Sequence, residues 1–146
     1  MKILLIGEYS RLHNSLKEGL LSLGHDVTIL GFNDGFKAYP VDFPLVKKWD
    51  SELLKKVKLA VLQLTGFDLT SYFTYRQFCK NQAYFQGFDV VQLINENSFY
   101  CDYRYETKIL NYLFRRNTKV FLLSCGDDYV HVNYNFNHPD NPSIVQ

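Results

Sequence analysis

Residues 1–31 read MKILLIGEYSRLHNSLKEGLLSLGHDVTILG, and this stretch decides the fold. Its first apolar run, Ile3–Ile6, ends at Gly7. A short, continuous apolar run is typical of a strand that is buried on both faces, as in a parallel sheet. A polar loop, a helical period and a second apolar run follow in that order. The stretch therefore predicts a strand–helix–strand unit, whose connection is expected to be right-handed.

The helix of this unit is predicted from its leucines. They recur at helical spacing and form one apolar stripe: Leu12, Leu16, Leu20 and Leu23. Ser10 is the expected N-cap residue, because a hydroxyl can accept a backbone N–H of the first turn. Gly24 is the expected C′ residue, and the second strand follows over residues 26–31.

The middle of the chain carries weaker patterns. Residues 32–50 include two prolines and predict an irregular loop, of a length that is often functional. Two helices are expected over residues 51–83, with a break at Gly66. A strand over residues 57–64 is the alternative interpretation, because apolar residues alternate there.

The second half of the chain predicts two more strands and a helix between them. The strands cover residues 89–94 and 119–124, and the helix covers residues 103–116. Asn117 is the expected left-handed residue at the end of this helix. Alternation over residues 130–136 predicts either an antiparallel edge strand or an extended surface loop.

The expected fold class is therefore α/β. A single Rossmann-like domain over residues 1–146 would form a three-layer sandwich around a mainly parallel sheet of four strands. An antiparallel edge strand near the C-terminus would be a fifth strand, if residues 130–136 form a strand and not a surface loop. A chain of this length suffices for one domain with a sizeable core.

Composition excludes several classes of function. The net charge is +1 and the charged residues are well mixed, which argues against nucleic-acid binding. Three widely spaced cysteines predict neither a disulfide framework nor a zinc site, and favour a reducing compartment. The first apolar run is too short for a signal peptide, so we expect a cytoplasmic protein. The high aromatic content, 16%, predicts either a ligand surface rich in tyrosine or simply a core filled with rings.

Compact catalytic motifs are missing from the sequence. The first strand is not followed by G-x-G-x-x-G, and there is no Walker A loop, G-x-S-x-G elbow or H-E-x-x-H pair. The four histidines have no spacing that favours a metal, so no metal site is expected.

The candidate binding residues are those expected at the carboxyl ends of the strands, where open α/β sheets bind ligands. The candidates for substrate binding are Gly7, Glu8, Tyr9, Ser10, Asn95 and Glu96. Such a rim of hydrogen-bonding groups suits a polyhydroxylated or phosphorylated small molecule. Loops are polar in most proteins, however, and an ordinary surface is the other interpretation.

His13 is the sharpest catalytic candidate. In the first helical turn, the helix dipole would lower its pKa and keep it available as a neutral base. Asp127 or Asp128, after the last predicted parallel strand, could orient the imidazole as the acid does in a triad. The alternatives are an exposed histidine at a helix start and two ordinary turn residues.

Three segments resemble the N-terminal domain of a GT-B-type glycosyltransferase. The first runs from Lys2 to Leu30 and contains the pattern L-x-x-x-G-H-x-V at Leu20–Val27. The other two, residues 88–95 and 123–128, are similar to later strands of such domains. The similarity covers most of the chain up to Asp128.

The resemblance implies an acceptor-binding domain that faces a second, donor-binding domain. The expected partners are then a sugar or glycan acceptor and the missing C-terminal donor domain, and the expected cofactor of the complete enzyme is a nucleotide-sugar donor. In some inverting members, a histidine at the start of the first helix is the base and pairs with a later aspartate, which fits His13 with Asp127 or Asp128. The chain alone is expected to be inactive, and its location could also be peripheral at the inner face of the membrane.

Two other functions compete with this one. A flavodoxin-like domain that binds a small molecule or a partner without catalysis fits the length and the missing motifs. A homodimer that forms through a sheet edge fits the strands over residues 119–124 or 129–136, because an open edge can pair with another copy.

Overall fold

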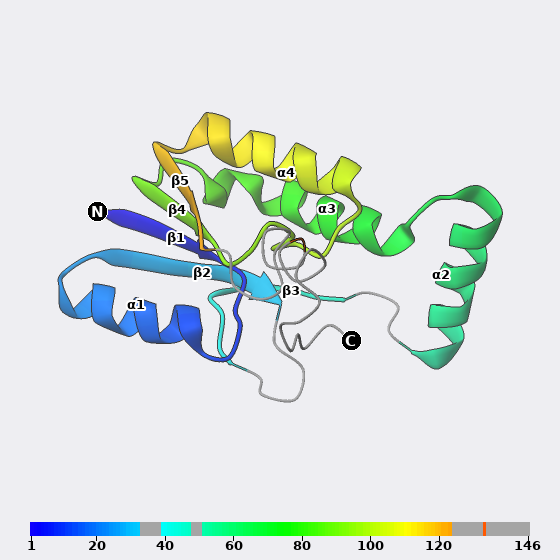
Figure 1. Ribbon diagram of the computed structural model, residues 1–146, viewed down its shortest axis with the longest axis horizontal. Coiled ribbons are helices and arrows are strands. Elements are labelled where there is room, and N and C mark those ends of the chain that lie inside the picture. Colours follow the sequence, from blue (N-terminus) through cyan, green and yellow to red (C-terminus); the bar gives the residue numbers. More distant parts are fainter. Residues whose placement is uncertain (33–38, 48–50, 124–132, 134–146) are drawn as a thin grey trace.

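A computed structural model describes residues 1–32, 39–47, 51–123 and 133, and Figure 1 shows the arrangement of its elements. Its strands are β1 (Lys2–Ile6), β2 (Asp26–Phe32), β3 (Phe43–Leu45), β4 (Val90–Leu93) and β5 (Lys119–Leu122). Its helices are α1 (Leu12–Ser22), α2 (Glu52–Thr65), α3 (Leu69–Asn81), the 3-10 turn η1 (Gln82–Phe85) and α4 (Tyr103–Arg116).

The sheet has the order β3-β2-β1-β4-β5 and every pair is parallel. The expected α/β, Rossmann-like fold is thus confirmed. Among the described residues the sheet has five strands where four were expected, because β3 lies inside the stretch expected to be irregular. Of the predicted edge strand over residues 130–136, all but residue 133 falls outside the described residues.

Contacts of Asp42, the residue before β3, fix the position of this strand, whose own sequence has no strand pattern. The backbone N–H of Asp42 donates to Ile29 O at 3.0 Å, and its carboxylate accepts the N–H of Ile29 at 2.6 Å. The same carboxylate pairs with Lys17 of α1 at 2.6 Å. Pro44, in the middle of β3, is tolerated there because an edge strand leaves some N–H positions unused.

The two faces of the sheet carry separate cores. Ile3, Leu5, Val27 and Ile29 point toward α1 and meet Leu16 and Leu20. The alternate residues of the same strands pack on the other face, against α3 and α4, where they meet the largest buried rings: Phe78, Phe85, Phe88 and Phe99. Figure 1 shows α1 on one side of the sheet and α3 with α4 on the other. Many of the phenylalanines therefore fill the core, as one of the two interpretations of the aromatic content predicts.

The start of α1 differs from the prediction. Ser10 is not the N-cap residue, because Ser10 and Arg11 both have left-handed backbones, with φ of 50° and 68°, and the helix begins at Leu12. The predicted end is correct, since Gly24 follows the C-cap residue Leu23 with a φ of 80°. Leu23 itself is exposed, so the apolar stripe is shorter than the leucine spacing suggests.

Residues 52–65 and 69–85 are helical, which confirms the preferred interpretation over the strand at residues 57–64. Gly66 makes the predicted break with a φ of 67°. The second helix ends at Asn81 and continues as η1. α2 packs against α3 and extends away from the sheet in Figure 1, and no residue of α2 is buried against the described chain.

The end of α4 also differs from the prediction. Asn117 is extended, with φ −132° and ψ 160°, and is not left-handed. Its side chain instead joins three segments: the amide donates to Leu113 O and Phe85 O, and its oxygen accepts the N–H of Phe88 at 2.9 Å. Asn117 thereby sets the entry to β4 as well as the exit from α4.

No described helix combines the length and the apolar character needed to cross a membrane.

Candidate functional site at the switch point

The strand order reverses between β1 and β4, which is where open α/β sheets bind ligands. Gly7 follows β1, and its N–H donates to Leu30 O at 2.8 Å. Ile94 follows β4, and its N–H donates to Ile6 O at 2.9 Å. The segments at these two strand ends, residues 7–10 and 95–98, are the switch-point loops. They contain all six predicted substrate-binding residues.

Two glycines, Gly7 and Gly31, allow close packing of the backbone at the switch point. Gly7 has a φ of 87°, and a β-carbon there would overlap the side chain of Ile94. A β-carbon on Gly31 would lie 3.3 Å from the Cα of Gly7. Gly7 therefore lets the end of β1 lie close to Ile94 after β4, and Gly31 lets β2 lie close to the end of β1.

Glu8 is buried behind the first switch-point loop, although its residue type predicts exposure. Only 7% of its surface is exposed. Its Oε2 accepts the backbone N–H of Asn14 at 2.8 Å and also the side-chain amide of Asn14. Its Oε1 is buried and has no hydrogen-bond partner among the described residues. Glu8, and not Ser10, thus caps the first turn of α1.

His13 lies inside the protein, beneath both strands of the switch point. It is 0% exposed, and its Nδ1 lies 2.6 Å from Gly7 O. A carbonyl can only accept, so Nδ1 carries the proton and Nε2 is the acceptor. Nε2 faces the amide nitrogen of Gln92 on β4 at 3.4 Å. Both ring nitrogens are therefore engaged in the neutral tautomer.

Burial lowers the pKa of His13, against the opposing effects of the Gly7 carbonyl and the Glu8 charge. The pKa is thus lowered, the direction predicted from the sequence, and the largest cause is desolvation by burial. A base has to reach its substrate within hydrogen-bond distance. The buried position favours a role in joining α1, β1 and β4, and the catalytic role of His13 stays a prediction. Asp127 and Asp128 lie outside the described residues.

The rest of the first loop is exposed and strained. Tyr9 is 53% exposed, and Ser10 and Arg11 follow it with positive φ. Consecutive left-handed residues other than glycine are costly, and such strain concentrates at functional sites. Arg11 pairs with Glu18 along α1 at 2.9 Å.

The second loop is a tight turn held by its own side chains. Ser98 donates to Asn95 O at 2.7 Å, and the side-chain oxygen of Asn95 accepts the N–H of Asn97 at 3.2 Å. Glu96 is exposed at the tip of this turn. The loop therefore presents an exposed carboxylate beside a half-buried amide.

Glu106 holds the chain that leads from this turn into α4. Its two carboxylate oxygens accept the N–H groups of Phe99 at 3.2 Å and Cys101 at 3.3 Å. Between them, Tyr100 has a φ of 50°. Burial raises the pKa of Glu106 to about 7, although both hydrogen bonds oppose the rise. Burial likewise raises the pKa of the Cys101 thiol to about 12.

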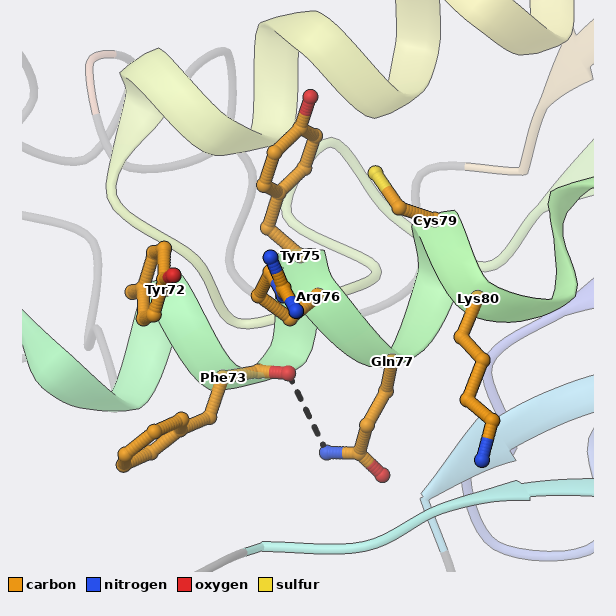
Figure 2. Close-up of a pocket in the computed structure, with 7 residues that line it drawn as sticks. All are labelled: Tyr72, Phe73, Tyr75, Arg76, Gln77, Cys79 and Lys80. Carbon is orange, nitrogen blue, oxygen red and sulfur yellow. Dashed lines mark hydrogen bonds between the residues drawn. The ribbon is translucent and has the colours of Figure 1, made fainter.

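Two pockets lie beside α3 and α4, and the smaller one reaches the second switch-point loop, because Glu96 is among its lining residues. An open pocket of about 680 Å³ follows the outer side of α3, and Figure 2 shows Tyr75 and Cys79 pointing toward α4 while Phe73 and Gln77 point the other way. Gln77 also bonds the backbone of Val46 with both ends of its amide, at 2.7 and 3.0 Å. A smaller apolar pocket of about 240 Å³ lies between α4 and β5. The lining residues of the larger pocket are at least partly exposed, so it offers rings and surface charge but no buried polar group.

Three polar residues of the site region were missed as candidates in the sequence: Asn14, Gln92 and Glu106. Gln92 carries a usable signal, because it interrupts an otherwise apolar strand. Glu106 and Asn14 look like ordinary polar helix residues, and only their tertiary contacts distinguish them. Among the described residues, no group of three or more histidine, cysteine, aspartate or glutamate side chains could hold a metal ion.

Comparison of the chain with protein families, with curated proteins and with solved structures finds no match. The functional argument therefore rests on the geometry of the site.

Proposed function

We propose that this chain binds the sugar acceptor of a glycosyltransferase at its switch-point loops. The observation that carries the proposal is Glu8, a buried carboxylate at the end of β1 with one oxygen that lacks a partner in the described chain. Carboxylates that accept hydroxyl hydrogens suit a polyhydroxylated ligand, and the strand order puts this one where α/β sheets bind ligands. The exposed ring of Tyr9 adds an apolar face beside it.

The sugar donor belongs to a second Rossmann-like domain in this proposal. Nucleotide phosphates usually bind to a glycine-rich turn at a helix N-terminus, and here that turn has one glycine and a carboxylate. The nucleotide-sugar would be held opposite the switch-point loops, and transfer would need both halves to exclude water and align the reactants. Acceptor binding without transfer is the activity proposed for the chain by itself.

The strand order also bears on the alternative function. A flavodoxin-like sheet has the order 2-1-3-4-5, whereas this sheet has β3 at its far edge and β4 beside β1. A domain that binds without catalysis is still an alternative function, but its fold is not flavodoxin-like.

The proposal is tested by ligand binding to ¹⁵N-labelled protein. Methyl glycosides of glucose, galactose and N-acetylglucosamine are compared with flavin mononucleotide, each followed through the backbone amide resonances. We expect at least one glycoside to shift residues 7–10 and 95–98, while the flavin leaves them unchanged. Flavin binding at these loops, with no response to any glycoside, would support the alternative instead.

A further inference from the structure

We propose that Glu8 makes the switch point selective for uncharged ligands that bear hydroxyl groups, and closes it to phosphates. This inference rests on the proposed function, because it names the chemistry by which that site binds the sugar acceptor and excludes the nucleotide. It concerns one carboxylate and the first turn of α1.

The N-terminus of α1 is already occupied by an anion from the chain itself. The first N–H groups of a helix attract phosphates, because they lack partners and lie at the positive end of the helix dipole. In this protein, Oε2 of Glu8 takes the N–H of Asn14 at 2.8 Å and the Asn14 side-chain amide as well. A phosphate that approached the same turn would meet a negative charge in place of a free donor.

The remaining oxygen of Glu8 calls for a donor. Buried carboxylate oxygens almost always accept a hydrogen bond, and an unpaired one is costly. Oε1 has no partner among the described residues, and the nearby ring of His13 already gives its one proton to Gly7 O. A ligand hydroxyl would supply the missing donor without adding charge. A phosphate at neutral pH would supply mainly acceptors.

The test uses the 146-residue chain and two substitutions, Glu8→Ala and Glu8→Gln. Glu8→Ala removes the anion and frees the Asn14 N–H, whereas Glu8→Gln removes the charge and keeps the volume. The probes are the three methyl glycosides as neutral ligands, with inorganic phosphate and uridine diphosphate as anions. Glu52→Gln, an exposed charge change on α2, is the matched control. Amide spectra report folding and binding together.

We expect the unsubstituted chain and the control to bind a glycoside and neither anion at residues 7–10. Glu8→Ala should gain phosphate binding by at least about tenfold and lose glycoside affinity by about tenfold, the size of one lost hydrogen bond to a charged group. Glu8→Gln should show the same loss of glycoside affinity and a smaller gain in phosphate binding. If Glu8→Ala does not fold, the gain and loss in Glu8→Gln decide the question.

The two proposals fail in different ways. Phosphate binding at these loops in the unsubstituted chain, or unchanged affinities in both Glu8 variants, would overturn the selectivity of Glu8 and leave acceptor binding intact. If no glycoside binds but Glu8→Ala gains phosphate, the acceptor function fails and the exclusion of phosphate by Glu8 stands.

Discussion

The Nδ1 of His13 lies 2.6 Å from the carbonyl oxygen of Gly7, so a buried imidazole ties the first helix to the end of the first strand. This bond fixes the tautomer of the ring and leaves Nε2 toward Gln92. The protein thus keeps a neutral histidine beneath its candidate binding site.

Acid should weaken the fold through His13. Burial lowers its pKa in the folded state, while the unfolded chain keeps the ordinary value of about 6.5. Below that pH the unfolded state binds more protons, so the free energy of unfolding should fall as pH drops from about 6.5 toward the folded pKa. Urea unfolding between pH 5 and 7.5 measures this slope. His13→Asn should flatten this pH dependence and His25→Asn should not. Equal slopes in the unsubstituted protein and both variants would show that His13 does not cause it.

Gly7→Ala should destabilise the protein more than Gly24→Ala. Both glycines have left-handed backbones, with φ of 87° and 80°, so both substitutions carry a similar conformational cost of about 1–2 kcal/mol. At Gly24 the new methyl group enters open space, whereas at Gly7 it meets Ile94. Overpacking adds about 1–3 kcal/mol at Gly7. Chemical denaturation of the two variants gives the difference directly, and a difference near zero would mean that Ile94 moves aside freely.

Glu106 should act in the opposite direction to His13. Its pKa rises from 4.5 to about 7 on folding, so the folded state holds the extra proton between those values. Its contribution to stability is complete below pH 4.5 and is lost as pH rises through 7, by about 3 kcal/mol in total.

Glu106→Gln should remove this pH dependence. An amide has one acceptor oxygen, so one of the two N–H groups at Phe99 and Cys101 loses its partner, at a cost of about 1–3 kcal/mol. Glu96→Gln, an exposed charge change nearby, is the control. A Glu106→Gln variant with an unchanged pH profile would show that folding does not shift the pKa of this carboxyl.

The homodimer expected from the sequence has one concrete location. β5 is the outermost strand on its side of the described sheet, and Phe121 and Leu122 are each 53% exposed. A parallel strand is normally buried on both faces, so this edge is suited to pairing with another copy. Sedimentation velocity should show concentration-dependent dimers that Phe121→Lys abolishes. Leu64→Lys, which changes an exposed leucine on α2, should leave them intact, and a monomer at all concentrations would exclude edge pairing.

Much of the fold could be predicted from local patterns. The apolar run of β1, the leucines of α1 and the glycine after it predict a strand–helix–strand unit, and packing on both faces of the sheet agrees with that prediction. β3 could not be predicted because three residues with a central proline carry no period, and its place depends on Asp42.

The site was predictable in position but not in detail. The carboxyl ends of β1 and β4 were expected to meet, and they do. The residue type of Ser10 favours it as the cap of α1. Its backbone is left-handed, however, and the carboxylate of Glu8 accepts the N–H of Asn14 in the first turn instead. Burial of Glu8, His13 and Glu106 depends on contacts between distant segments, and no local pattern reports those.

The exposure of α2 has a consequence for how the chain opens. With no residue of Glu52–Thr65 buried against the described chain, little tertiary packing supports this helix. A 14-residue helix is marginal in water without such packing. Its amides should therefore exchange with solvent deuterium through sub-global opening, long before those of β1 and β4. The chain would then behave as two cooperative units, in which one helix melts while the sheet stays closed.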